Sequence, residues 1–268
     1  MLLYFVFKKI PFSEIWVIIK TSKLYWVFFA LLFFILSQII SAERLWRYFR
    51  EIQFHFPKKD NWKLYLIGMF YNFFIPGGIG GDAYKVYVLH KKFGWGIKKL
   101  SAAVLADRLS GLLAIIILIQ FFGLTLLSGY YKLLIIFPII CTVFFAKLGF
   151  KFFFPSFKNI FSGSLFLSLL VQGLQLLTIF CIVSSFAAVE NIWVYFLVFL
   201  LSTVLSVLSF SGIGIREWVF MKAGYYLHYD ARISVAVAMI FTVISASVSL
   251  AGLFIQLKGL KLEKTDSL

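Results

Sequence analysis

The sequence predicts an all-α polytopic membrane protein with about five full spans and two re-entrant broken helices arranged as an inverted repeat. Hydrophobic residues make up 62% of the 268-residue chain and charged residues only 14%. A soluble domain is nearer half apolar and a quarter charged. Apolar runs of about 20 residues, the length that crosses a bilayer as a helix, recur along the chain. Two shorter runs end in glycine-rich breaks.

Unbroken apolar runs predict the five full spans. The runs do not alternate with polar residues, which excludes a transmembrane β-barrel. Lysine and arginine gather between the runs, and by the positive-inside rule these basic loops and the C-terminus face the cytoplasm. Lys8, Lys9, Lys20 and Lys23 fall on the opposite face in this topology. The expected spans are Leu24–Ile40, Leu100–Leu127, Leu133–Phe145, Leu165–Val189 and Ala231–Leu257.

The two shorter apolar runs are expected to enter and leave the membrane on one face. Leu64–Ile75 breaks at residues 76–81, and the segments on either side, 43–63 and 85–99, carry six and five basic residues. Basic flanks on both sides favour a hairpin that enters from the cytoplasm. The second run, Trp193–Phe210, must start and end outside if the C-terminus is inside. It is therefore expected to enter from the opposite face.

The two breaks resemble each other, which predicts an inverted repeat. Gly78-Ile79-Gly80 and Gly212-Ile213-Gly214 share one pattern, each is followed within three residues by an acid, and their spacing is half of the chain. Paired glycine-interrupted segments in the two halves of a membrane protein point to a binding site near the midplane. We expect one transmembrane unit over residues 1–268, without a soluble domain. The apolar start, residues 1–7, resembles the tail of a helix that begins upstream.

The first break contains residues expected to bind a substrate. Glycines permit a tight, exposed turn, and non-helical backbone at membrane depth must be buried in protein or line a wet cavity. A helix that starts after Gly81 directs free amides into that cavity and favours an anion such as a lipid phosphate. Asp82 and Lys85 share one face of that helix. In the alternative interpretation, Asp82 caps the helix and Lys85 extends to the interface. The candidates here are Asn72, Pro76, Gly77, Gly78, Gly80, Gly81, Asp82 and Lys85.

Two adjacent pairs of charged residues supply further candidates. Asp107 and Arg108 lie in an apolar stretch, where ionisable residues are costly and functional by default. Arg108 is suited to hold a phosphate through two hydrogen bonds, or to pair with Asp82 or Glu217. The second pair follows the second break, and for both pairs the alternative is a structural ion pair that joins helices. The candidates are Asp107, Arg108, Gly212, Gly214, Arg216 and Glu217.

Composition and spacing disfavour several other functions. The net charge of +15 suggests nucleic acid in a soluble protein, but here the cations lie between apolar runs. A basic rim that faces anionic lipid headgroups is expected instead. His55, His90 and His228 lack metal-ligand spacing, and no cofactor motif or activated nucleophile is present. We therefore expect no metal, no cofactor, no nucleic-acid partner and no catalytic residue.

Three motifs resemble, in order, the transmembrane region of lysylphosphatidylglycerol synthases: NFFIPGGIGGDAYKVYVL, VLADRLSGLL and SGIGIREW. This family is also described as flippase-like. In its bifunctional members the region is implied to move aminoacylated phospholipid across the bilayer, while a separate C-terminal domain transfers the aminoacyl group. The sequence shows no such domain, so the resemblance implies only the flippase-like half. Asp107 stands where the family more often has glutamate.

Together these features predict a bacterial inner-membrane protein that binds and moves a polar lipid, either a phospholipid or a polyprenyl-linked species. Arg108 and Arg216 would hold the headgroup phosphate, with the glycine breaks as floor and ceiling of the cavity. One alternative is a lipid-linked glycosyl transferase, which usually needs an acidic catalytic pair and a sizeable extramembrane loop. The other is a non-transporting partner of an envelope-synthesis complex. A homo-oligomer is compatible with each of these functions.

Overall fold

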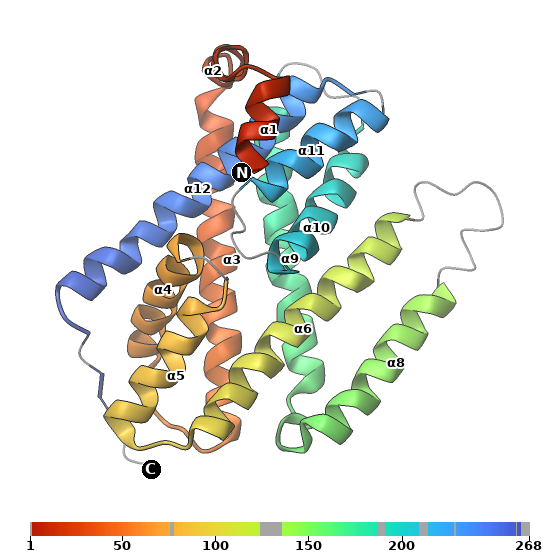
Figure 1. Cartoon of the computed structure of the whole chain (residues 1–268). Coiled ribbons are helices and arrows are strands. Elements are labelled where there is room, and N and C mark those ends of the chain that lie inside the picture. Colours follow the sequence, from red (N-terminus) through yellow and green to blue (C-terminus); the bar gives the residue numbers. More distant parts are fainter. Residues whose placement is uncertain are drawn as a thin grey trace.

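The computed structural model describes residues 2–75, 78–123, 136–186, 191–208, 214–227, 229–260 and 262–263. Within these ranges the chain is all-helical, and five helices are long and apolar enough to cross a membrane. They confirm the five predicted spans, which makes the protein a multi-pass membrane protein. The spans are α3 (Leu24–Glu51), α6 (Ile97–Gly123), α8 (Ile136–Phe153), α9 (Phe161–Ser184) and α12 (Ala231–Leu257) (Figure 1).

Shorter helices complete the part of the chain that the structure describes. Their ends follow ordinary helix signals: α4 begins directly after Pro57, and the Asp230 carboxylate accepts the backbone N–H of Arg232 at 2.8 Å to cap α12. The shorter elements are α1 (Leu2–Lys9), α2 (Phe12–Lys20), α4 (Lys58–Phe74), α5 (Gly80–Phe93), η2 (Pro155–Phe157), α10 (Ile192–Leu208) and α11 (Ile215–Tyr226).

The second half of the chain repeats the first half helix for helix. α4 and α10 have 17 residues each, and α6 and α12 have 27 residues each. In both pairs the second helix lies half a chain length after the first. α3 corresponds to α9, and α5 to α11, with nearly the same spacing but slightly different lengths. The predicted pair of broken helices in matching places is therefore confirmed.

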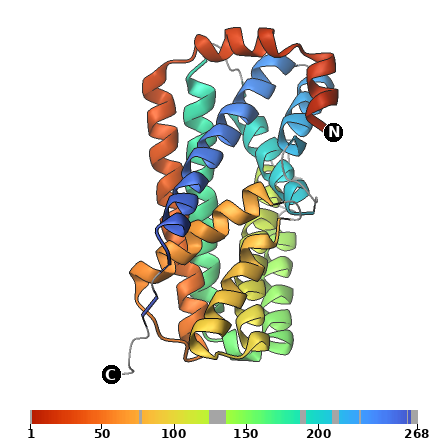
Figure 2. The same ribbon diagram turned by 60° about the vertical axis from the view of Figure 1, so that its left-hand side comes forward.

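The two halves cover each other's broken helices. α3 packs along α9, α12 packs against α4, and α10 packs against α6. In each half, the first helix of the broken pair packs against a long helix of the other half. This exchange is expected for two halves related by an approximate twofold axis. Figures 1 and 2 show α4 and α5 in the half of the molecule near the C-terminus, and α10 and α11 in the half near the N-terminus. The two broken pairs enter from opposite ends, which makes the repeat an inverted one.

The loops that are rich in lysine and arginine meet at one end of the molecule. Figure 1 shows the α3–α4, α5–α6 and α8–α9 connections together with the C-terminus at this end, which we call the basic end. α1 and α2 lie at the opposite end, where they pack against α11 and α12. Lys8, Lys9, Lys20 and Lys23 therefore lie away from the basic end, as the sequence predicted.

The crossing of α4 and α5 depends on glycine at position 81. A Cβ added there would overlap the carbonyl of Gly68, so the two backbones are in direct contact. Gly80 differs from expectation, because it is already the first residue of α5 and an added Cβ would meet its nearest neighbour at 3.4 Å. The backbone turns instead at Gly78, with φ 61°, and at Gly214, with φ 90°. The expectation of non-helical backbone is thus wrong for Gly80 and right for Gly214.

We expect Gly81→Ala to lower the free energy of unfolding by about 1–3 kcal/mol, because an added methyl group forces two contacting helices apart. Gly80→Ala is the matched control. Its Cβ meets only ordinary contacts, and alanine favours a helix over glycine by about 1 kcal/mol. Thermal unfolding of the protein in detergent measures both variants. Equal effects of the two substitutions would contradict the close crossing at Gly81.

Labelling of introduced cysteines tests the first hairpin. Lys59 and Lys92 are exposed residues near the two outer ends of α4 and α5, both at the basic end. In a background without Cys141 and Cys181, Lys59→Cys and Lys92→Cys should react with an impermeant thiol reagent from the same face of the membrane. Lys20→Cys, on α2 at the opposite end, should react from the other face. Reaction of positions 59 and 92 from different faces would rule out a re-entrant hairpin.

Candidate functional site

The break between α4 and α5 is held in a defined conformation. Gly78 adopts a left-handed φ of 61°, which directs the chain into the start of α5. The backbone N–H of Gly81 donates to the Asn72 side-chain oxygen at 2.8 Å, so α4 satisfies one of the amides that a helix start leaves free. Pro76 and Gly77, which were also predicted to belong to the site, lie outside the described residues.

A cluster of three charged residues follows this break. The Asp82 carboxylate accepts hydrogen bonds from the Arg108 guanidinium on α6 and, at 3.1 Å, from the Lys85 ammonium on α5. Arg108 also donates to the carbonyl oxygen of Gly78 at 3.0 Å. α6 is thereby bonded to both the turn and the first turn of α5. Because one carboxylate faces two cations, the cluster carries one excess positive charge.

Lys85 points into the protein instead of toward the membrane interface. Its side chain is 6% exposed, and its ammonium lies 5.1 Å from the ring centroid of Tyr65 on α4. Among the described residues, the Asp82 side chain accepts its hydrogen bonds from Lys85 and Arg108 and not from the free amides at the start of α5. The alternative interpretation, in which Asp82 caps the helix and Lys85 extends to the interface, is therefore wrong. The alternative considered only neighbours in the sequence. In the fold, Arg108 from α6 also bonds to the Asp82 carboxylate.

An apolar groove of about 480 Å³ lies between α5 and α6 and ends at this cluster. It runs from His90 and Ile97, near the basic end, to Ile79 and Arg108 at the break. Most of the side chains between these ends are apolar. The Arg108 side chain is 33% exposed and lines the groove. This cavity lies along one hairpin, whereas the sequence had predicted a cavity between the two breaks.

Asp107 pairs with a residue that the sequence did not single out. Arg44 on α3 donates to both carboxylate oxygens of Asp107, at 2.7 and 3.2 Å, and to the Ser168 hydroxyl on α9 at 2.8 Å. Arg44 is 6% exposed and Asp107 is 8% exposed. This geometry favours the structural ion pair. The sequence placed Arg44 in a loop because the apolar run stops at Ile40, but α3 continues beyond that point and carries Arg44 into the bundle.

The second break uses its acid differently. Gly214 precedes α11 with a φ of 90°, and its backbone N–H donates to Glu217 at 3.0 Å. Glu217 also accepts a hydrogen bond from the Thr242 hydroxyl on α12 at 2.7 Å, and it is 2% exposed. Glu217 therefore caps α11 and bonds it to α12. Gly212, the other glycine predicted for this break, lies outside the described residues.

Arg216 makes no ion pair with the residues that the structure describes. Its guanidinium lies 4.3 Å from the ring centroid of Phe241 and 5.4 Å from that of Phe199. Its Nε is buried and lacks a hydrogen-bond partner within the described ranges. Cation–π contacts offset part of the cost of a desolvated cation, but they leave the N–H donors unused. Among the described residues, Arg216 is thus a cation held between aromatic rings, with its Nε–H donor unpaired.

The two breaks make the same contact with different chemistry. Asp82 and Glu217 both occupy the third position of their helix, and each accepts a hydrogen bond from the long helix that follows. The donor is Arg108 in the first half and Thr242 in the second, and these two residues are half a chain length apart. The contact between the acid and the long helix therefore occurs in both halves. The positive charge lies on the long helix in the first half, at Arg108, and on the half-helix in the second, at Arg216.

These features define a class of membrane protein in which two inverted halves bring broken helices and charged side chains into the membrane interior. The chain belongs to the family described as the lysylphosphatidylglycerol synthase transmembrane region, whose sequence profile matches residues 1–252. This match confirms the resemblance of the three motifs. No curated protein matched the sequence closely enough to count as a relative. Among the described residues, no cluster of three or more His, Cys, Asp or Glu side chains is arranged to hold a metal ion.

Loss of one partner tests the buried Arg44–Asp107 pair. We expect Arg44→Gln to destabilise the protein by about 3–5 kcal/mol, because it leaves the Asp107 carboxylate buried without its cation. Arg47→Gln is the control, since Arg47 is half exposed and pairs with Glu43, a kind of pair worth at most about 1 kcal/mol. Thermal unfolding in detergent compares the variants. Adding Asp107→Asn to Arg44→Gln should recover stability, and a further loss would contradict the pairing.

Proposed function

We propose that the protein binds a polar lipid with a phosphate-bearing headgroup, either a phospholipid or a polyprenyl-linked lipid, and moves it across the inner membrane of a bacterium. The single observation that carries this proposal is the excess positive charge of the Asp82 cluster at the inner end of an apolar groove. A lipid offers the matching pair of features, an anionic phosphate and a hydrocarbon chain. The basic end would face the cytoplasm, as the positive-inside rule favours.

Arg108 is the residue best suited to hold the phosphate in the first half. Its planar guanidinium can bond to a carboxylate and a phosphate at once, because it carries five N–H donors. Asp82 would keep Lys85 as a partner while Arg108 turns part of its donors to the headgroup. The acyl chain would lie in the groove, where Ile79, Tyr87 and Leu105 are each more than half exposed and contact hydrocarbon in a membrane.

Arg216 would receive the headgroup in the second half. Its partners among the described residues are aromatic rings, so a phosphate would supply the hydrogen bonds that Nε lacks. A phosphate that leaves Arg108 would thus find a second cation, Arg216, in the other inverted half. The two halves share their helix contacts but place their cations differently. This relation supports movement of one ligand between Arg108 and Arg216. The family to which the chain belongs supports a lipid as that ligand.

Transport by reconstituted protein tests this proposal. In liposomes with a fluorescent phospholipid in one leaflet, Arg108→Gln should slow translocation by about 10–100-fold, because a hydrogen bond to a charged group contributes roughly 1.5–3 kcal/mol. Arg216→Gln should act in the same direction. Expression and melting temperature should stay near wild type for Arg108→Gln, because Asp82 retains Lys85. Arg232→Gln, an exposed arginine at the opposite end, is the matched control.

The same liposomes separate the proposal from its alternatives. Lipid movement without any donor sugar supports translocation. Transfer of sugar from a lipid-linked donor would instead indicate a glycosyl transferase, and neither activity would favour a non-transporting partner. Wild-type rates in both arginine variants would overturn the assigned roles of Arg108 and Arg216.

A further inference from the structure

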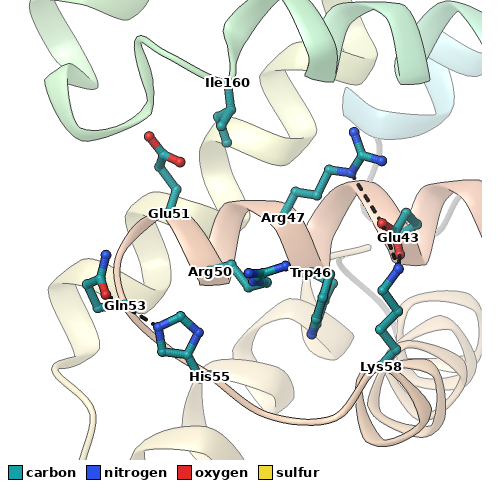
Figure 3. Close-up of a pocket in the computed structure, with 9 residues that line it drawn as sticks. All are labelled: Glu43, Trp46, Arg47, Arg50, Glu51, Gln53, His55, Lys58 and Ile160. Atoms are coloured by element: carbon teal, nitrogen blue, oxygen red, sulfur yellow. Dashed lines mark hydrogen bonds and ion pairs between the residues drawn. The ribbon is translucent and has the colours of Figure 1, made fainter. Parts of the chain in front are cut away.

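A second cavity, of about 570 Å³, lies at the basic end and shares no lining residue with the groove between α5 and α6. It is formed by the last two turns of α3, the loop that follows, and the first residue of α4 (Figure 3). Ile160, from the connection before α9, closes one side. In contrast to the groove, its lining is dominated by charged and polar side chains, so its ligand must be polar.

Trp46 forms a fixed wall of this pocket. Its indole N–H donates to the carbonyl oxygen of Phe56 at 2.9 Å, which holds the ring against the loop. The Arg50 guanidinium and the Lys58 ammonium each lie 4.7 Å from the centroid of the Trp46 ring. The Trp46 ring therefore contacts two cations from different helices, Arg50 of α3 and Lys58 of α4. Cation–π contacts position both without using their hydrogen-bond donors.

The acids of the pocket leave Arg50 without a carboxylate. Glu43 pairs with both Arg47, at 3.2 Å, and Lys58, at 3.1 Å. Figure 3 shows Glu51 pointing away from Arg50 and Trp46, on the other side of α3. Within the described part of the chain, the Arg50 guanidinium takes part in no ion pair and no hydrogen bond, and its contact is the cation–π contact with Trp46. All five N–H donors of its guanidinium are therefore available to a ligand beside Trp46.

We propose that this pocket is a binding site for a phosphate group, held by Arg50 and Lys58 against the Trp46 wall. Arginine binds phosphate through two parallel hydrogen bonds, and lysine adds a compact second charge. His55 stands on the same side of the pocket as Arg50 in Figure 3 and supplies a further ring nitrogen. The phosphate can belong to a lipid headgroup in the adjacent leaflet or to a soluble molecule. The proposal does not rest on lipid translocation, because it concerns a different cavity.

Hydrogen–deuterium exchange of the full chain in nanodiscs tests the site locally. Residues 52–58 should exchange more slowly in nanodiscs of three parts phosphatidylcholine to one part phosphatidylglycerol than in phosphatidylcholine alone, or upon addition of inorganic phosphate. At a phosphate concentration ten times its Kd, opening should be suppressed about tenfold. Protection by the anionic lipid alone identifies a headgroup, protection by inorganic phosphate alone identifies a soluble ligand, and either result supports a phosphate site.

Control variants distinguish a specific phosphate site from a general electrostatic effect of the positive charge at the basic end. Arg50→Gln with Lys58→Gln should abolish the protection. Lys92→Gln with Lys98→Gln removes the same charge from exposed positions on the same end and should retain it. Equal loss in both double variants, or no protection by either probe in the wild type, would overturn the proposal. Arg108→Gln should keep the protection, so failure here is distinguishable from failure of the translocation function.

Discussion

The Asp82 carboxylate connects the elements on which the first half of the protein depends. It accepts hydrogen bonds from Arg108 and Lys85, while Arg108 also holds the carbonyl of Gly78. In hydrocarbon, broken backbone and unpaired charge are tolerated only where the protein satisfies them. A single acid thereby allows a helix break, two cations and a long helix to meet at membrane depth. The same arrangement leaves one positive charge uncompensated, and the proposed lipid phosphate would balance that charge.

The inverted repeat explains why a related contact occurs twice and why the two occurrences differ. α4 and α10 have equal lengths and begin half a chain apart, and α5 and α11 each place an acid at the third position of the half-helix. In the second half, the donors to Glu217 among the described residues are neutral groups, the Gly214 backbone N–H and the Thr242 hydroxyl. Its neighbour Arg216 has no carboxylate partner in the part of the chain that the structure describes, and it lies between aromatic rings. The two halves thus present two cationic positions with different partners, and the proposed movement of a lipid uses both.

Several site residues were predictable because their signals are local. Asp82 and Lys85 are three residues apart, and that spacing brings them together on any helix. Arg44 was not predictable in the same way, because its partner Asp107 is 63 residues away and its burial depends on α9 packing along α3. Gly80 and Gly81 look equivalent in the sequence. Only the approach of Gly68 on α4 makes Gly81 the residue that cannot carry a side chain.

The sequence by itself determined the class of the protein, its five spans, the two glycine breaks and their repeat, because hydrophobicity, charge placement and motif spacing act along the chain. Only the tertiary structure decided which charges meet. It paired Arg108 with Asp82, enclosed Arg44 with Asp107, left Arg216 among aromatic rings, and assembled the basic pocket around Trp46. The physical reason is that an ion pair in a low-dielectric interior depends on distances between helices, which a linear pattern does not contain.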